Sequence, residues 1–148
     1  MTERIIKTLV QRLAAEEEMD YSDAIETQFG PAMTLFQAIV NRIAATCDEE
    51  GAEFLLALLA GRSFLERPGS LSAQYQEIVR TQIVAWAEAR DLPVIDVANA
   101  MRHRAQGTST GWYFKNEGHL TPAGHRVAAE ILLPTILECA ALRSTPTR

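Results

Sequence analysis

Residues 53–60 read EFLLALLA, a short and continuous apolar run that follows Gly51 and ends at Gly61. The run has no helical period, and its flanking glycines favour a strand that is buried on both faces. Residues 93–97 read PVIDV and predict a second short strand of the same kind. Because a helical pattern lies between the two runs, we expect them to be strands of one parallel sheet.

Helical periodicity surrounds these two runs on both sides. Apolar residues recur at helical spacing, and each such range predicts a helix. The ranges are 3–18, 33–50, 71–90 and 122–142. Residues 61–70 have the glycine and proline content of a loop, residues 19–31 suit a loop or a short helical turn that ends at Gly30-Pro31, and residues 98–103 suit a helical turn.

The composition limits the class of protein. The chain has 148 residues and a formal net charge of −5, which suits one domain with its own core. No basic run interleaved with aromatic residues is present, so we expect no nucleic-acid partner. The charged N-terminal stretch has no signal-peptide pattern, and no segment reaches the roughly 20 apolar residues of a membrane span. Cys47 and Cys139 form no CxxC pair, and we interpret them as buried or half-buried thiols.

Residues 114–130 read FKNEGHLTPAGHRVAAE and allow three interpretations. His119 and His125 are six residues apart, whereas zinc-binding histidines on a helix are four apart, so a metal site is disfavoured. Thr121 as N-cap and Pro122 as first helical residue would make the segment a plain helix start. In the third interpretation His119 is a general base and the carboxylate of Glu117 orients its imidazole.

The stretch WYFKNEGHLTPAGHRVAAEIL resembles the last block of SGNH (GDSL-type) hydrolases, and GAEFLLALLAGRS and AEARDLPVIDVANAM resemble two of their strand segments. The resemblance covers about residues 33–140. It implies a three-layer α/β/α fold with a parallel, flavodoxin-like sheet, N-terminally incomplete and forming a single domain over residues 1–148.

The resemblance also implies the site residues. His119 stands at the position of the catalytic base, and Glu117 at that of the orienting acid, where part of the family has aspartate two residues before the histidine. Where other members space the acid three residues before, this sequence has Asn116. His125 matches a helix residue without a catalytic role, and no cofactor or metal is implied.

The family's nucleophile is the serine of a Gly-Asp-Ser block after the first strand, and no such block is present in this sequence. Ser22 follows a charged helical pattern and not a strand, so it is a poor candidate. Ser63 comes after a predicted strand, but the family gives that position no such role. The sequence therefore resembles the C-terminal portion of an SGNH hydrolase, without the segment that bears the serine.

The resemblance implies hydrolysis of carboxylic esters, or of acyl or acetyl groups on carbohydrates or lipids, by a Ser–His–Asp/Glu mechanism. The alternative is an inactive truncated relative that binds a partner or associates with itself, because its sheet edge would stay exposed. Two smaller questions remain open. The aromatic residues Trp112, Tyr113 and Phe114 could line an acyl pocket or pack in the core, and Arg62 and Arg67 could flank a cleft or lie in solvent.

Overall fold

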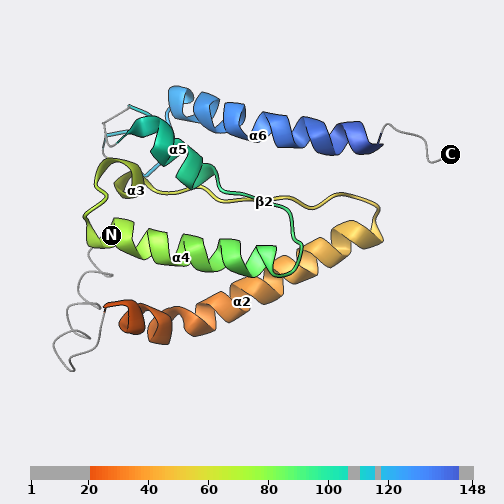
Figure 1. Cartoon of the computed structure of the whole chain (residues 1–148), viewed down its shortest axis with the longest axis horizontal. Coiled ribbons are helices and arrows are strands. Elements are labelled where there is room, and N and C mark those ends of the chain that lie inside the picture. Colours follow the sequence, from red (N-terminus) through yellow and green to blue (C-terminus); the bar gives the residue numbers. More distant parts are fainter. Residues whose placement is uncertain (1–20, 107–110, 116–117, 144–148) are drawn as a thin grey trace. The chain divides into compact units, whose positions relative to one another are not determined.

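The computed structural model describes residues 21–106, 111–115 and 118–143, which are mostly helical (Figure 1). The elements follow in the order α2 (Tyr21–Glu49), β1 (Leu56–Ala57), α3 (Arg62–Glu66), α4 (Leu71–Glu88), β2 (Val94–Ile95), α5 (Val97–Ala105) and α6 (Pro122–Arg143). Both predicted strands exist, but each is reduced to two residues. The predicted helix over residues 3–18 lies outside the described residues.

The prediction of a three-layer α/β/α sheet is wrong. Within the described residues the sheet consists of β1 and β2 alone, and helices make up most of the rest. The physical reason lies in the sequence pattern. Two described segments lack a helical period, and a parallel strand stays extended only where a neighbour satisfies its backbone groups. With one neighbour each, the two strands pair over a short length.

Strands β1 and β2 pair in parallel, with Leu56 opposite Val94 and Ala57 opposite Ile95. The N–H of Leu56 donates to the carbonyl of Pro93, and that of Leu58 to the carbonyl of Ile95, both over 2.9 Å. In a parallel pair alternate residues turn their backbone groups to the same neighbour. Leu56 and Leu58 therefore face β2, and Ala57 faces the opposite edge of β1.

Helix α4 connects the two strands, and both it and α5 begin with a side-chain cap. The Ser70 hydroxyl accepts from the N–H of Ala73 over 3.2 Å, and the Asp96 carboxylate accepts from the N–H of Asn99 over 3.0 Å. Such caps satisfy N–H groups that have no partner within the helix. The predicted helix over residues 71–90 is confirmed to within two residues, and the predicted turn at 98–103 is the middle of α5.

One predicted loop, and one segment predicted as a loop or a short helical turn, contain helices. Residues 62–66 form the short helix α3, within the segment read as a loop. Helix α2 begins at Tyr21 and continues through Gly30 and Pro31, where the sequence predicted a break. Proline omits one helical hydrogen bond but suits helical φ, and the hydroxyl of Thr34 donates to the carbonyl of Gly30 over 3.0 Å. The predicted break is therefore absent, because a proline costs the helix one hydrogen bond and does not prevent it from continuing.

The described chain divides into two compact units. Helix α2 belongs to the unit that ends at Phe54, and β1 and everything after it belong to the unit that begins at Leu55. The second unit has its own buried core, formed by Phe64, Leu65, Val97, Ala98, Met101, Ala105, Tyr113 and Ala128. These residues come from α3, α5, the segment before α6, and α6 itself. The core therefore joins the segment that carries His119 to α3 and α5.

Candidate active site

The segment that carries His119 is held between two short backbone contacts. Tyr113 and Leu120 form an antiparallel bridge, and the N–H of Phe114 donates to the carbonyl of His119 over 3.0 Å. The N–H of Thr121 donates to the carbonyl of Trp112 over 2.8 Å. These bonds fix the backbone on both sides of the turn, so the base of the His119 side chain has a defined position. We call residues 112–115 and 118–121 the His119 loop.

The loop leads directly into α6. The hydroxyl of Thr121 accepts from the N–H of Gly124 over 3.2 Å and donates to the carbonyl of Gly111 over 2.9 Å. Pro122 is the first residue of α6. The sequence prediction of an N-cap at Thr121 followed by proline is thus confirmed. This capping alone would suit a plain helix start, so the case for a site rests on where the loop lies.

Two hydrogen bonds attach the His119 loop to the residues that follow β1. The buried hydroxyl of Tyr113 donates to the carbonyl of Ala60, and the guanidinium of Arg62 donates to the carbonyl of Lys115. Arg62 also pairs with Glu66 over 2.5 Å. Burial raises the pKa of Tyr113 to about 12, helped by the negative charge of Glu66. The loop therefore lies at the carboxyl end of β1, the end at which open α/β sheets carry their sites.

The imidazole of His119 is exposed, and no hydrogen bond or ion pair joins it to another of the described residues. Its predicted partner Glu117, like Asn116, lies outside the described residues. His125 is exposed on the first turn of α6, and His103 is exposed on α5. Within the described ranges, no three His, Cys, Asp or Glu side chains gather in a way that could hold a metal ion.

Ser63, the better of the two in-chain hydroxyl candidates, is buried in a structural network. Its Oγ lies 2.8 Å from the Oγ of Ser72 and accepts from the amide nitrogen of Gln76 over 3.0 Å. The amide oxygen of Gln76 accepts from the N–H of Gly61 over 2.6 Å. This network joins the start of α3 to α4, and sequence reasoning missed it because Gln76 is thirteen residues from Ser63. Ser22 lies in α2.

The aromatic residues of the loop divide between core and surface. Tyr113 is buried in the core cluster and Trp112 packs against it. Phe114 is 47% exposed. Core packing is thus confirmed for the first two residues, and Phe114 is the aromatic side chain of the three that is available to a ligand.

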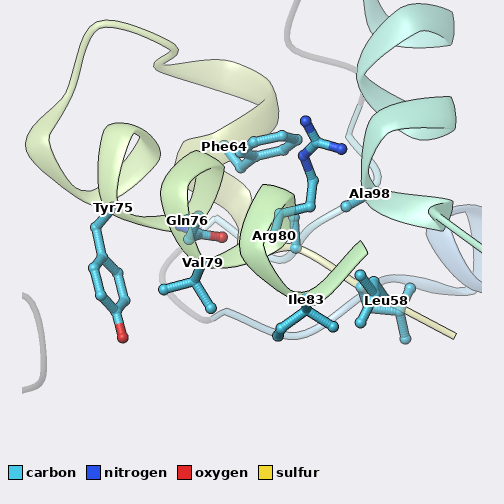
Figure 2. Close-up of a pocket in the computed structure, with 10 residues that line it drawn as sticks. Leu58, Phe64, Tyr75, Gln76, Val79, Arg80, Ile83 and Ala98 are labelled. Carbon is cyan, nitrogen blue, oxygen red and sulfur yellow. The ribbon is translucent and has the colours of Figure 1, made fainter. Parts of the chain in front are cut away.

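A pocket of about 120 Å³ lies elsewhere, between α4 and the residues around the end of β1. Figure 2 shows Val79 and Ile83 projecting from the same side of α4, with Leu58 beside Ile83. Leu59 and Tyr75 also line the pocket, and most of its surface is apolar. The spacing of Tyr75, Val79 and Ile83, four residues apart each time, was a usable sequence signal, but it predicts an apolar helix face and not a hollow.

Next to this pocket, charged side chains tie α4 to α5. Arg80 bonds to Glu77 over 2.6 Å and also pairs with Asp96, while Arg102 bonds to Glu77 over 2.7 Å. The hydrogen bond from Arg80 is the main cause that holds the pKa of Glu77 below its usual value. The Arg102 guanidinium lies 4.4 Å from the ring centre of Phe64, a cation–π distance. We interpret this network as structural, because its charges are paired with one another.

No family model, curated protein or solved structure matches the chain. No helix within the described residues is both long and apolar enough to cross a membrane. The hydrolase resemblance thus remains a proposal that stands on the quoted residues and on the position of the His119 loop.

Proposed function

We propose that this chain supplies the general base of a hydrolase that cleaves esters, or acyl or acetyl groups, by a Ser–His–acid mechanism. In this proposal His119 is the base and Glu117 the orienting acid. The serine and the groups that stabilise the oxyanion come from a segment outside these 148 residues. The observation that supports it is the attachment of the His119 loop to the carboxyl end of β1 through Tyr113 and Arg62.

In each half of the reaction His119 accepts one proton and then donates it. Its imidazole takes the proton of the serine hydroxyl while the serine oxygen bonds to the ester carbonyl carbon. The imidazolium then gives that proton to the departing alcohol, the ester C–O bond breaks, and an acyl-serine remains. Water attacks the acyl-serine in the same way and releases the acid. The Glu117 carboxylate would hold the imidazole in the tautomer that accepts the proton.

The position of the described serines supports an external nucleophile. The Ser63 hydroxyl is buried and already bonded to Ser72 and Gln76, so it would have to leave the network that joins α3 to α4 in order to reach an ester. A base without a nucleophile and oxyanion donors accelerates ester cleavage little. We therefore expect the 148-residue chain alone to be a poor esterase.

The test begins by sequencing the DNA upstream of the Met1 codon and by translating it in the same reading frame and in adjacent frames. The search is for a predicted strand followed by Gly-Asp-Ser. The protein that bears this segment is then assayed for hydrolysis of p-nitrophenyl acetate, either as one longer chain that includes His119 or mixed with the 148-residue chain. We expect His119→Ala to lower kcat/KM at least about 10³-fold. His125→Ala, an exposed histidine six residues away, is the matched control and should retain the parent rate.

Equal rates for the His119→Ala and His125→Ala proteins would sink the hydrolase proposal. So would the absence of any serine-bearing segment in the same or adjacent frames. Either result would favour the second candidate function, a module that binds or associates with itself. The observation in favour of that candidate is the free edge of β1, where Leu59 is 56% exposed.

A further inference from the structure

The edge of β1 that faces away from β2 is apolar and open. Leu56 and Leu58 direct their backbone groups to β2, so those of Ala57 and Leu59 point to the other edge. No described residue pairs with them there. Ala57 is exposed, and Leu59 is among the exposed large apolar residues of the chain. Unpaired, uncharged edges of this kind accept a further strand.

The apolar pocket adjoins this same edge. Leu58 and Leu59 line it together with Val79 and Ile83 of α4, and Leu58 lies beside Ile83 (Figure 2). An engineered cavity of roughly 150 Å³ holds a benzene ring. The pocket, at about 120 Å³, therefore suits one branched aliphatic side chain. Strand addition uses this combination, in which backbone bonds along the edge are joined by a side chain seated in a neighbouring hollow.

We propose that a second copy of this chain adds its own β1 to this edge, antiparallel, about a two-fold axis at Ala57. Residues 54–60 form an uncharged run centred on Ala57, so this register pairs the whole run with itself. Ala57 then lies opposite Ala57 of the second copy, and Leu55 opposite the second copy's Leu59. Leu56 of the second copy lies beside Leu58, which lines the pocket.

The positions of helices and charges favour a second copy as the occupant. Helix α4 contacts β2, and it lines the pocket together with Leu58 and Leu59, which follow β1, so it lies along one side of the strand pair. Two strand spacings of about 4.8 Å would put the two α4 helices about 10 Å apart, which is close to a helix-packing distance. Glu50 and Glu53 precede β1 in the sequence, and Arg62, Glu66 and Arg67 follow it, which leaves one net positive charge on that side. An antiparallel copy brings the acidic end of one strand beside the basic end of the other.

This inference rests on the second candidate function, and the hydrolase proposal does not depend on it. The first test is a cross-link at the two-fold axis. Directly opposite residues that exchange hydrogen bonds have Cα atoms about 5.5 Å apart, within the range of a disulfide. In a background with Cys47→Ser and Cys139→Ser, we expect Ala57→Cys to form a covalent dimer under mild oxidation. Leu133→Cys, at a residue 53% exposed on α6, is the control and should stay monomeric.

The second test is sedimentation equilibrium on the parent, on Leu59→Lys and on Leu133→Lys, two leucines of similar exposure. We expect Leu59→Lys to raise the dimer Kd at least about tenfold, because it places a charge on the paired edge, and Leu133→Lys to leave it unchanged. Circular dichroism checks that each variant is folded, and the cross-link decides the question if Leu59→Lys is not.

The outcomes distinguish self-association of the chain from the specific antiparallel pairing of β1 about Ala57. A parent that stays monomeric at all concentrations overturns both self-association and the proposed pairing. A parent dimer that neither forms the cross-link at position 57 nor responds to Leu59→Lys overturns the pairing alone, as does a dimer that dissociates on Leu133→Lys.

Discussion

At the scale of single residues, Gly124 has the clearest requirement in the His119 loop. It lies in the first turn of α6, against the backbone of Trp112. A Cβ atom at position 124 would stand 2.1 Å from the carbonyl oxygen of Trp112, which itself bonds to the N–H of Thr121. The Leu120 side chain also lies near this position, but the nearest atom belongs to the backbone of Trp112, which cannot move aside as a flexible side chain would. The residue therefore allows α6 to start directly against the loop.

We expect Gly124→Ala to lower the free energy of unfolding by about 2–3 kcal/mol or more, because the added methyl forces the loop away from α6. This outweighs the roughly 1 kcal/mol that alanine usually gains over glycine in a helix. Gly118→Ala in the same loop is the control, since a Cβ there meets no atom within 4 Å. Urea denaturation measures both, and equal effects would contradict the packing argument.

Much of this local arrangement was predictable, but its cause was not. The residue types at Thr121 and Pro122 predict a helix start, so the start of α6 can be found from the sequence alone. The need for glycine at 124 arises from a carbonyl twelve residues earlier, whose position depends on the Tyr113–Leu120 bridge. Likewise, Arg62 and Tyr113 hold the loop through contacts with residues 53 positions away. No local pattern encodes such contacts.

At the scale of elements, the ion-pair network decides how α4 and α5 are held. Glu77 accepts from both Arg80 and Arg102, and Arg80 also pairs with Asp96, the N-cap of α5. The Arg80 and Asp96 side chains are 14% and 22% exposed, so this pair is shielded from solvent more than the surface pair of Arg104 with Glu130. We expect the network to contribute a pH-dependent part of the stability.

The folded-state pKa of Glu77 is lowered, so its contribution is present above the usual value of 4.5 and is lost as the pH falls through the folded pKa. We expect Glu77→Gln to lower the free energy of unfolding at pH 7 by up to about 1 kcal/mol. Between pH 5 and pH 3 the variant should lose less stability than the parent. Urea titrations over this range measure the difference.

Glu130→Gln is the control for this experiment, because Glu130 pairs with Arg104 at a site where the two side chains are 56% and 47% exposed. Its effect should stay within about 0.5 kcal/mol and should not change the pH slope. Parallel pH slopes for the parent and for Glu77→Gln would show that the network carries no acid-dependent stability.

The helices were easier to predict than the sheet. Apolar spacing identified α4 and α6 closely, because a helix satisfies its backbone internally and its pattern is local. The sheet was overestimated because strands depend on neighbours: the run at 53–60 reads as a central strand, yet two of its residues pair and one edge stays open. Short α3 was missed since five residues are too few to show a period.

At the scale of the whole molecule, the division at Phe54 and Leu55 separates α2 from everything that forms the candidate site. The core cluster, both strands and the His119 loop all lie in residues 55–148. Trp86 and Trp112, both tryptophans of the chain, lie there as well. Tryptophan fluorescence therefore reports on this unit alone.

We expect a fragment of residues 55–148 to unfold cooperatively in urea, with a fluorescence midpoint close to that of the full chain, because it retains the whole core cluster. The control is a fragment that ends before Trp112, which removes Tyr113 and Ala128 from that core and should not fold. A fragment 55–148 without a cooperative transition would mean that the unit needs residues 1–54 for its stability.

The two hydrogen bonds that anchor the His119 loop also set an order of events during synthesis. Ala60 and Arg62 leave the ribosome long before their partners Tyr113 and Lys115, which follow 53 residues later. At about 5–20 residues per second, that delay is about 3–10 s. During this delay the leucine-rich stretch around β1 is not yet contacted by the His119 loop and, for much of the time, is not yet paired with β2. The nascent chain is then at its most vulnerable to misassociation, and any holding chaperone would have to act in that interval.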